Sequence, residues 1–243
     1  MPELPEVETI ARVLRQHLLG QRLDGARLAA ISRHGKALLF DFSDAAPGRE
    51  RLVARLGMTG TLRLNATPDK HTQAVLQFER DTLVYSDIRK FGRLVWSAEP
   101  LHLGPDILAM PAEQLAAKLA TRERAIKPLL LDQALASGLG NIYVDECLFA
   151  ARTHPLTPAS CVDAVALSNA VTRILEAAIA AGGSTISDFF DPLGRAGQYQ
   201  LQHRVYGRSG EPCPNCGAPI VRLLVAQRGT HICPQCQPLP LHR

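Results

Sequence analysis

Apolar residues recur at helical spacing near the start of the chain. The helix predicted over residues 5–19 collects them on one face, at Val7, Ile10, Leu14 and Leu18. From residue 36 the pattern changes to short strand-like runs, separated by turn-rich segments that contain Asp, Pro and Gly. The predicted strands span residues 37–42, 52–64, 73–79, 82–86 and 93–96. This half is therefore predicted to be an antiparallel β-sandwich that begins with a helix.

Helical spacing returns in the second half of the chain. The predicted helices span residues 112–123, 128–137, 142–151 and 164–181, and the tight turn Gly138-Leu-Gly-Asn141 joins the second to the third. The predicted fold class is α+β with two domains. Its segments are a β-sandwich domain at 1–103, a linker at 104–111, a helical domain at 112–204 and a terminal hairpin module at 205–243.

The terminal module contains two Cys-x-x-Cys pairs. Cys213 with Cys216 and Cys233 with Cys236 supply four thiolates, which is the ligand set of a structural, tetrahedral Zn²⁺ site. Two disulfides are the alternative, but they require an oxidising compartment that nothing in the sequence indicates. The strands predicted between the pairs span residues 220–226 and 230–233, with Arg228 at the tip of the hairpin. The other two cysteines, Cys147 and Cys161, are predicted to be buried thiols.

Charge adds an expectation about partners. The 243 residues carry a net charge of +4, and the segment from residue 193 onward holds six arginines against one acid, Glu211. A basic C-terminal segment in an otherwise near-neutral chain indicates contact with a polyanion. No apolar run approaches the roughly 20 residues of a membrane span, and the acidic N-terminus is unlike a secretory signal. We therefore expect a cytoplasmic protein that does not associate with membranes.

The turn before the third helix is a candidate contact for phosphate. Asn141 stands where an N-cap residue belongs, so the free amides of the next turn would face outward. Helix N-termini bind phosphate through such amides. The alternative is an ordinary capped helix pair that only packs, and the basic hairpin in the same chain favours the DNA-backbone contact.

The N-terminus is a candidate nucleophile. Removal of Met1 would leave Pro2 as a secondary amine, which can attack an electrophilic sugar carbon and form an iminium intermediate. Glu3 and Glu6 lie beside it in sequence and could exchange protons. The alternative is that both acids complement the start of a helix. That alternative accounts for the acids but not for the proline at position 2.

Several motifs in order resemble one known family. They are Pro2-Glu-Leu-Pro-Glu-Val-Glu-Thr9, Leu56-Gly-Met-Thr-Gly60, Asp87-Ile-Arg-Lys-Phe-Gly92, Gly138-Leu-Gly-Asn-Ile-Tyr143, Val205-Tyr-Gly-Arg208 and the four cysteines. Together they resemble the bacterial formamidopyrimidine-DNA glycosylases of the Fpg/Nei family over nearly the whole chain. The resemblance implies a helix-two-turn-helix domain with a zinc ribbon. It also implies an enzyme that excises oxidised purines and then nicks the strand by β- and δ-elimination.

The resemblance also implies roles for individual residues. Pro2 would be the Schiff-base nucleophile, Glu3 the acid at the sugar ring oxygen, Lys36 a phosphate contact that assists elimination, and Arg228 the arginine linked to δ-elimination. Three side chains would fill the gap left by an everted nucleotide: Met58, Arg89 and Phe91. Four would contact DNA: His71, Arg89, Arg122 and Asn141. The expected partner is double-stranded DNA with oxidised bases or abasic sites, bound by a monomer that holds one Zn²⁺.

Two departures from the family pattern leave alternatives open. The segment between Arg27 and Lys36 is shorter than expected and lacks a strand-and-helix excursion, and Arg55 stands where the family often has histidine. One competing interpretation is an enzyme that prefers oxidised pyrimidines. The other is a DNA-damage binder that kept the scaffold but lost catalysis through this shortening. The segment 191–204 corresponds in place to a loop that closes over the everted base. A mobile linker to the ribbon is the alternative there.

Overall fold

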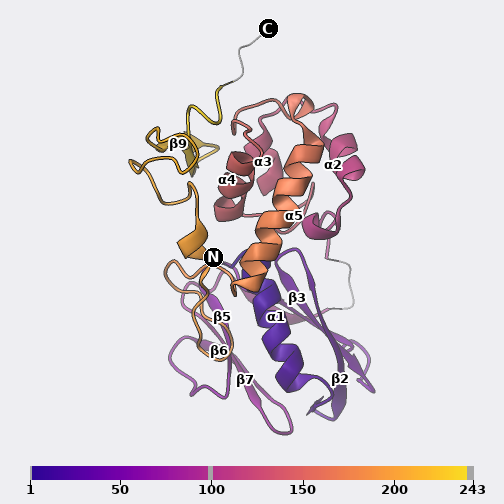
Figure 1. The fold of residues 1–243 in the computed structure, drawn as a ribbon. Coiled ribbons are helices and arrows are strands. Elements are labelled where there is room, and N and C mark those ends of the chain that lie inside the picture. Colours follow the sequence, from indigo (N-terminus) through magenta and orange to yellow (C-terminus); the bar gives the residue numbers. More distant parts are fainter. Residues whose placement is uncertain (1, 98–100, 240–243) are drawn as a thin grey trace. The chain divides into compact units, whose positions relative to one another are not determined.

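The computed structural model describes residues 2–97 and 101–239 and divides into two compact units (Figure 1). The first unit holds the chain up to residue 102 together with residues 178–200, and the second holds residues 103–177 and the chain from residue 201 onward. This division differs from the predicted boundaries, because residues 178–200 join the first unit rather than the helical one.

Helix α1, Leu4–Leu18, opens the first unit, as predicted. Pro5 lies in its first turn, where a missing N–H costs nothing, and Glu3 is its N-cap residue. The apolar stripe identified in the sequence is buried in the core of the unit, and Leu4, Val7, Leu14 and Leu18 are all fully buried.

Two antiparallel sheets share this core. The larger sheet has the order β1-β2-β3-β4-β8, formed by Arg22–Leu23, Ala26–His34, Ala37–Ser43, Arg51–Arg55 and Arg93–Trp96. The smaller has the order β5-β7-β6, formed by Gly60–Leu64, Thr82–Asp87 and Thr72–Gln77. Phe40 of the larger sheet, Leu62 and Leu83 of the smaller, and the buried face of α1 belong to one hydrophobic cluster. The prediction of an antiparallel β domain with an N-terminal helix is confirmed.

Two details of the predicted strands are wrong. The run 52–64 is not one strand but two, β4 and β5, which lie in different sheets. Gly57 breaks it, with φ of +60° and a backbone so close to Gly92 N that a Cβ would lie 2.8 Å away. Strand β2 was not predicted, because only Leu28 and Ile31 of its nine residues are buried, and a bulge between Leu28 and Ala30 sets these two three residues apart instead of in alternation.

The second unit contains helices α2, Ala112–Leu119; α3, Ile126–Leu131; α4, Asn141–Ala150; and most of α5, Ala164–Ala180. The predicted helix 128–137 is wrong beyond residue 131, because the Asp132 carboxylate accepts the Ala134 N–H and turns the chain. Short 3-10 turns lie at Ile107–Ala109, Ala159–Cys161 and Tyr199–Gln202. Among the described residues, no helix is long and apolar enough to cross a membrane.

The hairpin of the second unit consists of β9, Val221–Val225, and β10, Arg228–Ile232. Its small core is formed by Ile220, Val205 and Phe149, together with two of the cysteines. Cys147 is buried, as predicted, but Cys161 is exposed, so that prediction is wrong. Cys161 ends a one-turn 3-10 helix at the surface, where its side chain finds no core to enter.

Candidate functional site

The first candidate group lies at the start of α1. The Glu3 backbone N–H donates to Glu6 Oε2 at 2.8 Å, and the Glu3 side chain accepts the Glu6 backbone N–H in return. Glu6 Oε1 also accepts the Ser184 N–H at 2.7 Å. Both side chains are buried. These bonds form a capping box at the start of α1, so the alternative interpretation, that these acids complement the helix start, is confirmed.

Pro2 itself is buried and lines a cavity. The other lining residues come from α1, from the β4–β5 connection and the start of β5, and from the segment after α5: Ile10, Met58, Thr59, Gly60, Thr61, Asp188, Phe189 and Phe190. The structure thus brings Pro2 and Met58, far apart in sequence, to one cavity. Met1, whose removal would free the Pro2 nitrogen, lies outside the described residues.

Met58, Arg89 and Phe91 also lie together. The Arg89 guanidinium stacks over the Phe91 ring, with Cζ 4.7 Å from the ring centroid, and its Nη1 lies 3.3 Å from Met58 Sδ. Met58 is 39% exposed and Phe91 60% exposed. Both apolar side chains therefore lie at the surface and are not packed in the core. They form an exposed cluster held on two adjacent loops.

Asp87, which the sequence motif contained without an assigned role, organises this cluster. Its Oδ1 accepts Thr59 Oγ1 at 2.6 Å and the Arg89 N–H at 3.2 Å, and its Oδ2 accepts the Gly92 N–H at 2.7 Å. Burial raises the pKa of Asp87, but these donors outweigh it and hold that pKa below its ordinary value. The charged carboxylate fixes the loop from which Arg89 and Phe91 project.

Gly92 is required at the end of this loop. A Cβ there would lie 2.3 Å from the hydroxyl oxygen of Tyr85 and 2.7 Å from the Arg55 carbonyl oxygen. Burial, together with the neighbouring charge of Asp87, raises the pKa of Tyr85 to about 12, so the phenol stays protonated. The last glycine of the motif is thus explained by close packing.

Lys36 and His71 occupy turns of the first unit. Lys36 is half-buried in the two-residue turn between β2 and β3. His71 lies just before β6; its N–H donates to Asp69 Oδ1 at 2.9 Å, and its carbonyl accepts the Asp87 N–H at 3.0 Å. The backbone of His71 is therefore tied to the residue that organises the exposed cluster.

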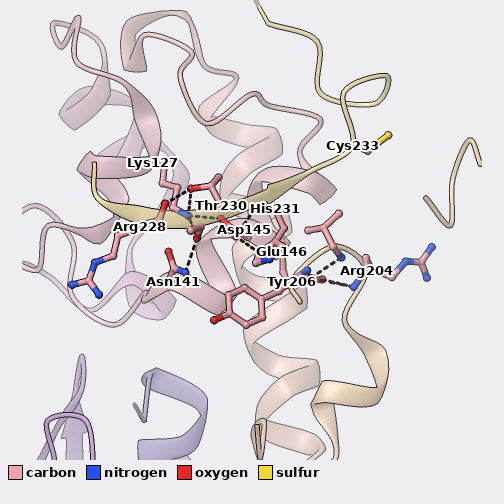
Figure 2. A network of polar contacts seen from close by, with 12 residues as sticks. Lys127, Asn141, Asp145, Glu146, Arg204, Tyr206, Arg228, Thr230, His231 and Cys233 are labelled. Carbon is pink, nitrogen blue, oxygen red and sulfur yellow. Dashed lines mark hydrogen bonds and ion pairs between the residues drawn. The ribbon is translucent and has the colours of Figure 1, made fainter. Parts of the chain in front are cut away.

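In the second unit the structure corrects the position of Asn141. Gly140 is the N-cap residue of α4, and Asn141 is the first helical residue. The Asn141 side chain instead donates from Nδ2 to the Gly229 carbonyl at 2.9 Å, on strand β10 (Figure 2). The cap prediction is wrong because a contact with a residue far along the chain takes the side chain. Asn141 therefore holds the hairpin against α4.

The tip of the hairpin is also one residue away from its predicted place. Ala226 and Gln227 form the turn, with φ of +47° and +61°, and Arg228 is the first residue of β10, paired with Val225. Positive φ at both central positions is the signature of a type I′ turn. Arg228 is exposed, and its side chain extends away from the buried polar residues in Figure 2.

A buried polar network lies behind Arg228, and the sequence did not reveal it. Lys127 Nζ donates to Asp145 Oδ1 at 2.6 Å and to Thr230 Oγ1 at 2.8 Å. Asp145 Oδ2 accepts the His231 N–H at 2.8 Å. Figure 2 shows these side chains converging from α3, α4 and β10. The sequence shows little sign of it, because Lys127 lies just before the predicted helix 128–137 and Asp145 lies inside the predicted helix 142–151.

Glu146, next to Asp145, holds the segment that leads into the hairpin. Its Oε1 accepts the backbone N–H groups of Val205 at 2.9 Å and Tyr206 at 2.8 Å, and its Oε2 accepts that of Arg204 at 2.9 Å. Burial raises the pKa of Glu146 despite these donors. Arg204 is exposed beside this anchor (Figure 2), and its Nη2 donates to Asn215 Oδ1 at 3.3 Å.

Arg122 is exposed in the connection after α2. Its Nε donates to the Lys118 carbonyl at 2.8 Å, which caps the end of the helix. Its guanidinium keeps other donors for an anion, but the structure adds no further sign of a ligand.

The four cysteines fit one zinc ion. Their Sγ atoms all lie within 4.8 Å of one another, with Cys213 and Cys236 3.8 Å apart and Cys216 and Cys233 3.4 Å apart. A tetrahedron with Zn–S bonds near 2.3 Å has sulfur–sulfur edges of about 3.8 Å. The Asn215 and Cys236 N–H groups donate to Cys213 and Cys233 Sγ at 3.4 Å, which stabilises thiolates. Four thiolates fill the coordination sphere, so the site is structural.

The chain matches three family models in order. They are the formamidopyrimidine-DNA glycosylase N-terminal domain over residues 19–94, the formamidopyrimidine-DNA glycosylase H2TH domain over residues 102–190, and the zinc finger found in FPG and IleRS over residues 210–239. The last match agrees with the cluster of four sulfur atoms.

Similar proteins span the whole chain. The formamidopyrimidine-DNA glycosylase of Solibacter usitatus is 42% identical over 266 residues, covering 98% of this chain and 99% of that one. That of Thermus thermophilus is 45% identical over 269 residues, with 98% of each covered. Both alignments exceed the 243 residues of this chain, so these relatives carry residues that it lacks.

Solved structures agree. The crystal structure of the MutM (Fpg) protein from Thermus thermophilus has a TM-score of 0.88 at 42% identity, covering 97% of this chain and 98% of that one. Lactococcus lactis Fpg in complex with DNA that contains an abasic site has a TM-score of 0.88 at 35% identity, covering 98% and 100%. With a shared fold and this identity over nearly its full length, the chain belongs to the formamidopyrimidine-DNA glycosylase family.

Proposed function

We propose that this protein excises oxidised purines from double-stranded DNA and nicks the resulting abasic site, with Pro2 as the nucleophile. The observation that carries the proposal is the cavity that Pro2 shares with Met58, one member of the exposed Met58–Arg89–Phe91 cluster. The Lactococcus lactis relative has been solved with DNA that contains an abasic site and with DNA that contains N7-benzyl-Fapy-dG. That protein therefore binds both the lesion and the product of base removal.

The chemistry follows from a free secondary amine. Without Met1, the lone pair of the Pro2 nitrogen attacks C1′, the glycosidic bond breaks, and the base leaves with the bonding electrons and a proton. Glu3, next in the chain, donates a proton to the sugar ring oxygen as the ring opens and the iminium forms. Loss of a C2′ proton then expels the 3′ phosphate, a second elimination expels the 5′ phosphate, and hydrolysis frees Pro2.

Lys36 and Arg228 are proposed to act on the phosphates. Each elimination expels a phosphate, and a nearby cation stabilises the negative charge of the leaving group. Arg228 is exposed at the start of β10, and Lys36 lies in a turn of the unit that contains Pro2. His71, Arg122 and Asn141 are proposed contacts to the DNA backbone.

The exposed cluster is proposed to replace the everted nucleotide. Flipping a base out of the stack costs roughly a few kcal/mol, because stacking and pairing are lost. Apolar side chains inserted into the vacancy offset part of that cost. Phe91 and Met58 are exposed, and the stacked Arg89 adds a cation for the phosphates.

The segment that follows Asp191 is proposed to close over the everted base. The buried Asp191 Oδ1 accepts the N–H groups of Leu193 and Arg195, both at 2.9 Å, and the Pro192 carbonyl accepts the Leu64 N–H. The loop is therefore built on a fixed base rather than freely mobile. Close packing requires glycine at position 197, because a Cβ there would lie 2.2 Å from the Gly183 carbonyl oxygen. Leu193 is 45% exposed and forms the solvent-facing edge of this loop.

The zinc site and the cellular setting complete the proposal. Four thiolates arranged for a metal are typical of a reducing compartment, so we place the protein in the cytoplasm, with the bacterial chromosome. One Zn²⁺ would hold the ribbon from which Arg228 projects. The protein is proposed to act as a monomer.

Trapping with borohydride tests this function. Reduction of the iminium with 8-oxoguanine duplex should leave a covalent protein–DNA adduct, which a DNA-damage binder without catalysis would not form. Rates on 8-oxoguanine and 5-hydroxyuracil duplexes, compared under single-turnover conditions, separate a purine preference from a pyrimidine preference. Binding without an adduct would contradict the proposed enzyme.

A further inference from the structure

The carboxylate of Glu8, on the second turn of α1, gathers three arginines. Its Oε2 accepts Arg33 Nε at 3.1 Å, and its Oε1 accepts Arg15 Nη1 at 3.1 Å and Arg12 Nε at 3.2 Å. Arg33 is the most buried of the three, with a side chain 9% exposed, against 57% for Arg12. Burial raises the pKa of Glu8, but the arginines outweigh it and hold that pKa below its ordinary value.

Arg33 also contacts the turn that carries Lys36. Its Nη1 donates to the Gly35 carbonyl at 3.0 Å. Strands β2 and β3 pair up to His34 and Ala37, so Gly35 and Lys36 alone form the turn, and Gly35 has φ of +57°. The Gly35 carbonyl and the Lys36 nitrogen belong to one planar peptide unit. A bond that fixes this carbonyl therefore fixes the backbone from which the Lys36 side chain starts.

A second bond ties the same strand to the helix. Arg15 Nε donates to the Ile31 carbonyl of β2 at 2.6 Å. The Glu8 carboxylate thus links α1, which begins at the Glu3 cap beside Pro2, with the end of β2 and with the turn. In this chain β2 passes directly into β3, so a minimal hairpin presents the lysine.

We propose that Arg33, held by Glu8, is a positioning residue that sets the place of Lys36 against the helix that begins beside Pro2. The inference rests on the proposed role of Lys36 in elimination. A guanidinium suits this task because its planar fork donates to the carboxylate and to the carbonyl at the same time. A lysine at position 33 would keep the charge but could not reproduce both bonds.

A double-mutant cycle tests the coupling. Arg33→Gln, Lys36→Gln and the double variant are compared in single-turnover cleavage of an abasic-site duplex at saturating enzyme. Arg33→Gln alone should slow cleavage about tenfold relative to the unmodified protein. Added to Lys36→Gln, it should slow cleavage by less than about twofold relative to Lys36→Gln alone, because the lysine that Arg33 positions is gone. Arg12→Gln is the matched control: it removes another partner of Glu8 without touching the turn, and should cleave like the unmodified protein.

A merely structural role would behave differently. If Arg33→Gln only destabilised the protein, it would reduce the cleavage rate by the same factor with Lys36 present and with Lys36 replaced. That result would overturn the positioning role. Arg33→Lys, which keeps the ion pair with Glu8, provides a second variant should Arg33→Gln unfold; it should show a smaller loss that also vanishes in the Lys36→Gln background. Unchanged cleavage by Lys36→Gln alone would instead overturn the proposed role of Lys36 in elimination, and with it the proposal that Arg33 acts by positioning Lys36.

Discussion

The Nζ of Lys127 lies 2.6 Å from Asp145 Oδ1, and neither side chain has any exposure to solvent. The pair links α3 to α4, and through Thr230 and His231 it also holds strand β10. Arg228 begins that strand. The place of a residue proposed to act on DNA therefore depends on a buried ion pair that does not itself reach the surface.

Removing one charge of this pair should destabilise the second unit. Asp145→Asn leaves the Lys127 ammonium buried without its counterion, a change that costs about 3–5 kcal/mol in comparable buried pairs. Chemical denaturation should show a loss of that order in the free energy of unfolding. The double variant Lys127→Met with Asp145→Asn removes both charges and keeps an acceptor for the His231 N–H. It should be more stable than Asp145→Asn alone; the opposite order would contradict this account.

The covalent adduct should form on Pro2. Mass spectrometry of the borohydride-trapped complex should locate the crosslink on the N-terminal peptide, because only the Pro2 nitrogen combines a free secondary amine with the cavity of Met58. A crosslink on Lys36 would show that the nucleophile is misassigned. A tag that keeps Met1 in place should abolish trapping, since the Pro2 nitrogen stays an amide, whereas Pro2→Gly should retain some lyase activity through its primary amine.

Short-range patterns predicted much of the fold. The apolar stripe of α1 follows directly from residue spacing, the turn-rich segments do separate most of the predicted strands, and the two cysteine pairs do converge on one site. The exposed cluster of Met58, Arg89 and Phe91 was expected from motifs in two different loops, which the structure brings together. Glycines flank these motifs, at Gly57 and Gly92, and their backbones approach each other too closely for any other residue.

Contacts between distant parts of the chain could not be predicted in this way. Asn141 is of a residue type that often caps helices. Its partner, Gly229, lies on strand β10 far along the chain, and only the folded chain brings the two together. Lys127 reads as an isolated charge before an apolar helix until the folded chain places Asp145 opposite it. Strand β2 was not predicted for another reason: a bulge between Leu28 and Ala30 interrupts its pairing, so its two buried residues do not follow a simple alternation.

Loss of one zinc ligand should weaken DNA binding while the first unit stays folded. Cys216→Ser leaves three thiolates, so the ribbon should lose zinc and no longer hold Arg228 in place. Metal analysis should show loss of zinc, and affinity for a lesion duplex should fall, while circular dichroism retains the helical signal. Cys161→Ser, an exposed thiol outside the cluster, is the control and should keep both zinc and affinity. Normal binding by Cys216→Ser would mean that the ribbon does not contact DNA.

His203 should make stability depend on pH. Burial lowers the pKa of this imidazole from 6.5 to about 4, and its ring packs edge-on against Tyr206. The unfolded chain therefore binds a proton between pH 6.5 and 4 that the folded chain does not. The stability contributed by the neutral His203 is therefore complete above pH 6.5 and is lost as the pH falls toward 4. The free energy of unfolding falls by up to about 1.4 kcal/mol per pH unit in this range.

His203→Phe isolates this contribution, because it keeps an aromatic ring beside Tyr206 and removes the titrating group. Its free energy of unfolding, measured at several pH values between 7 and 4, should decline less steeply than that of the unmodified protein. Parallel curves would show that His203 is protonated equally in both states, contrary to its burial.

Weakening the base of the proposed lid should separate the two reactions. Asp191→Ala removes the acceptor of the Leu193 and Arg195 N–H groups, bonds to a charged group that contribute roughly 1.5–3 kcal/mol each. The loop should then lose its shape, and excision of 8-oxoguanine should fall at least about tenfold. Cleavage at a preformed abasic site should stay within about twofold, because no base has to be held and Pro2 still reaches C1′.

The control for the lid is Arg195→Ala. It removes the ion pair between Arg195 and Asp191, formed by a side chain 63% exposed, but leaves both backbone bonds in place. Exposed ion pairs contribute about 0–1 kcal/mol, so this variant should excise 8-oxoguanine at nearly the normal rate. If Asp191→Ala instead slowed both reactions equally, the segment would be a structural support of the first unit and not a lid over the base. The ratio of the two rates, rather than either rate alone, therefore decides between the two interpretations.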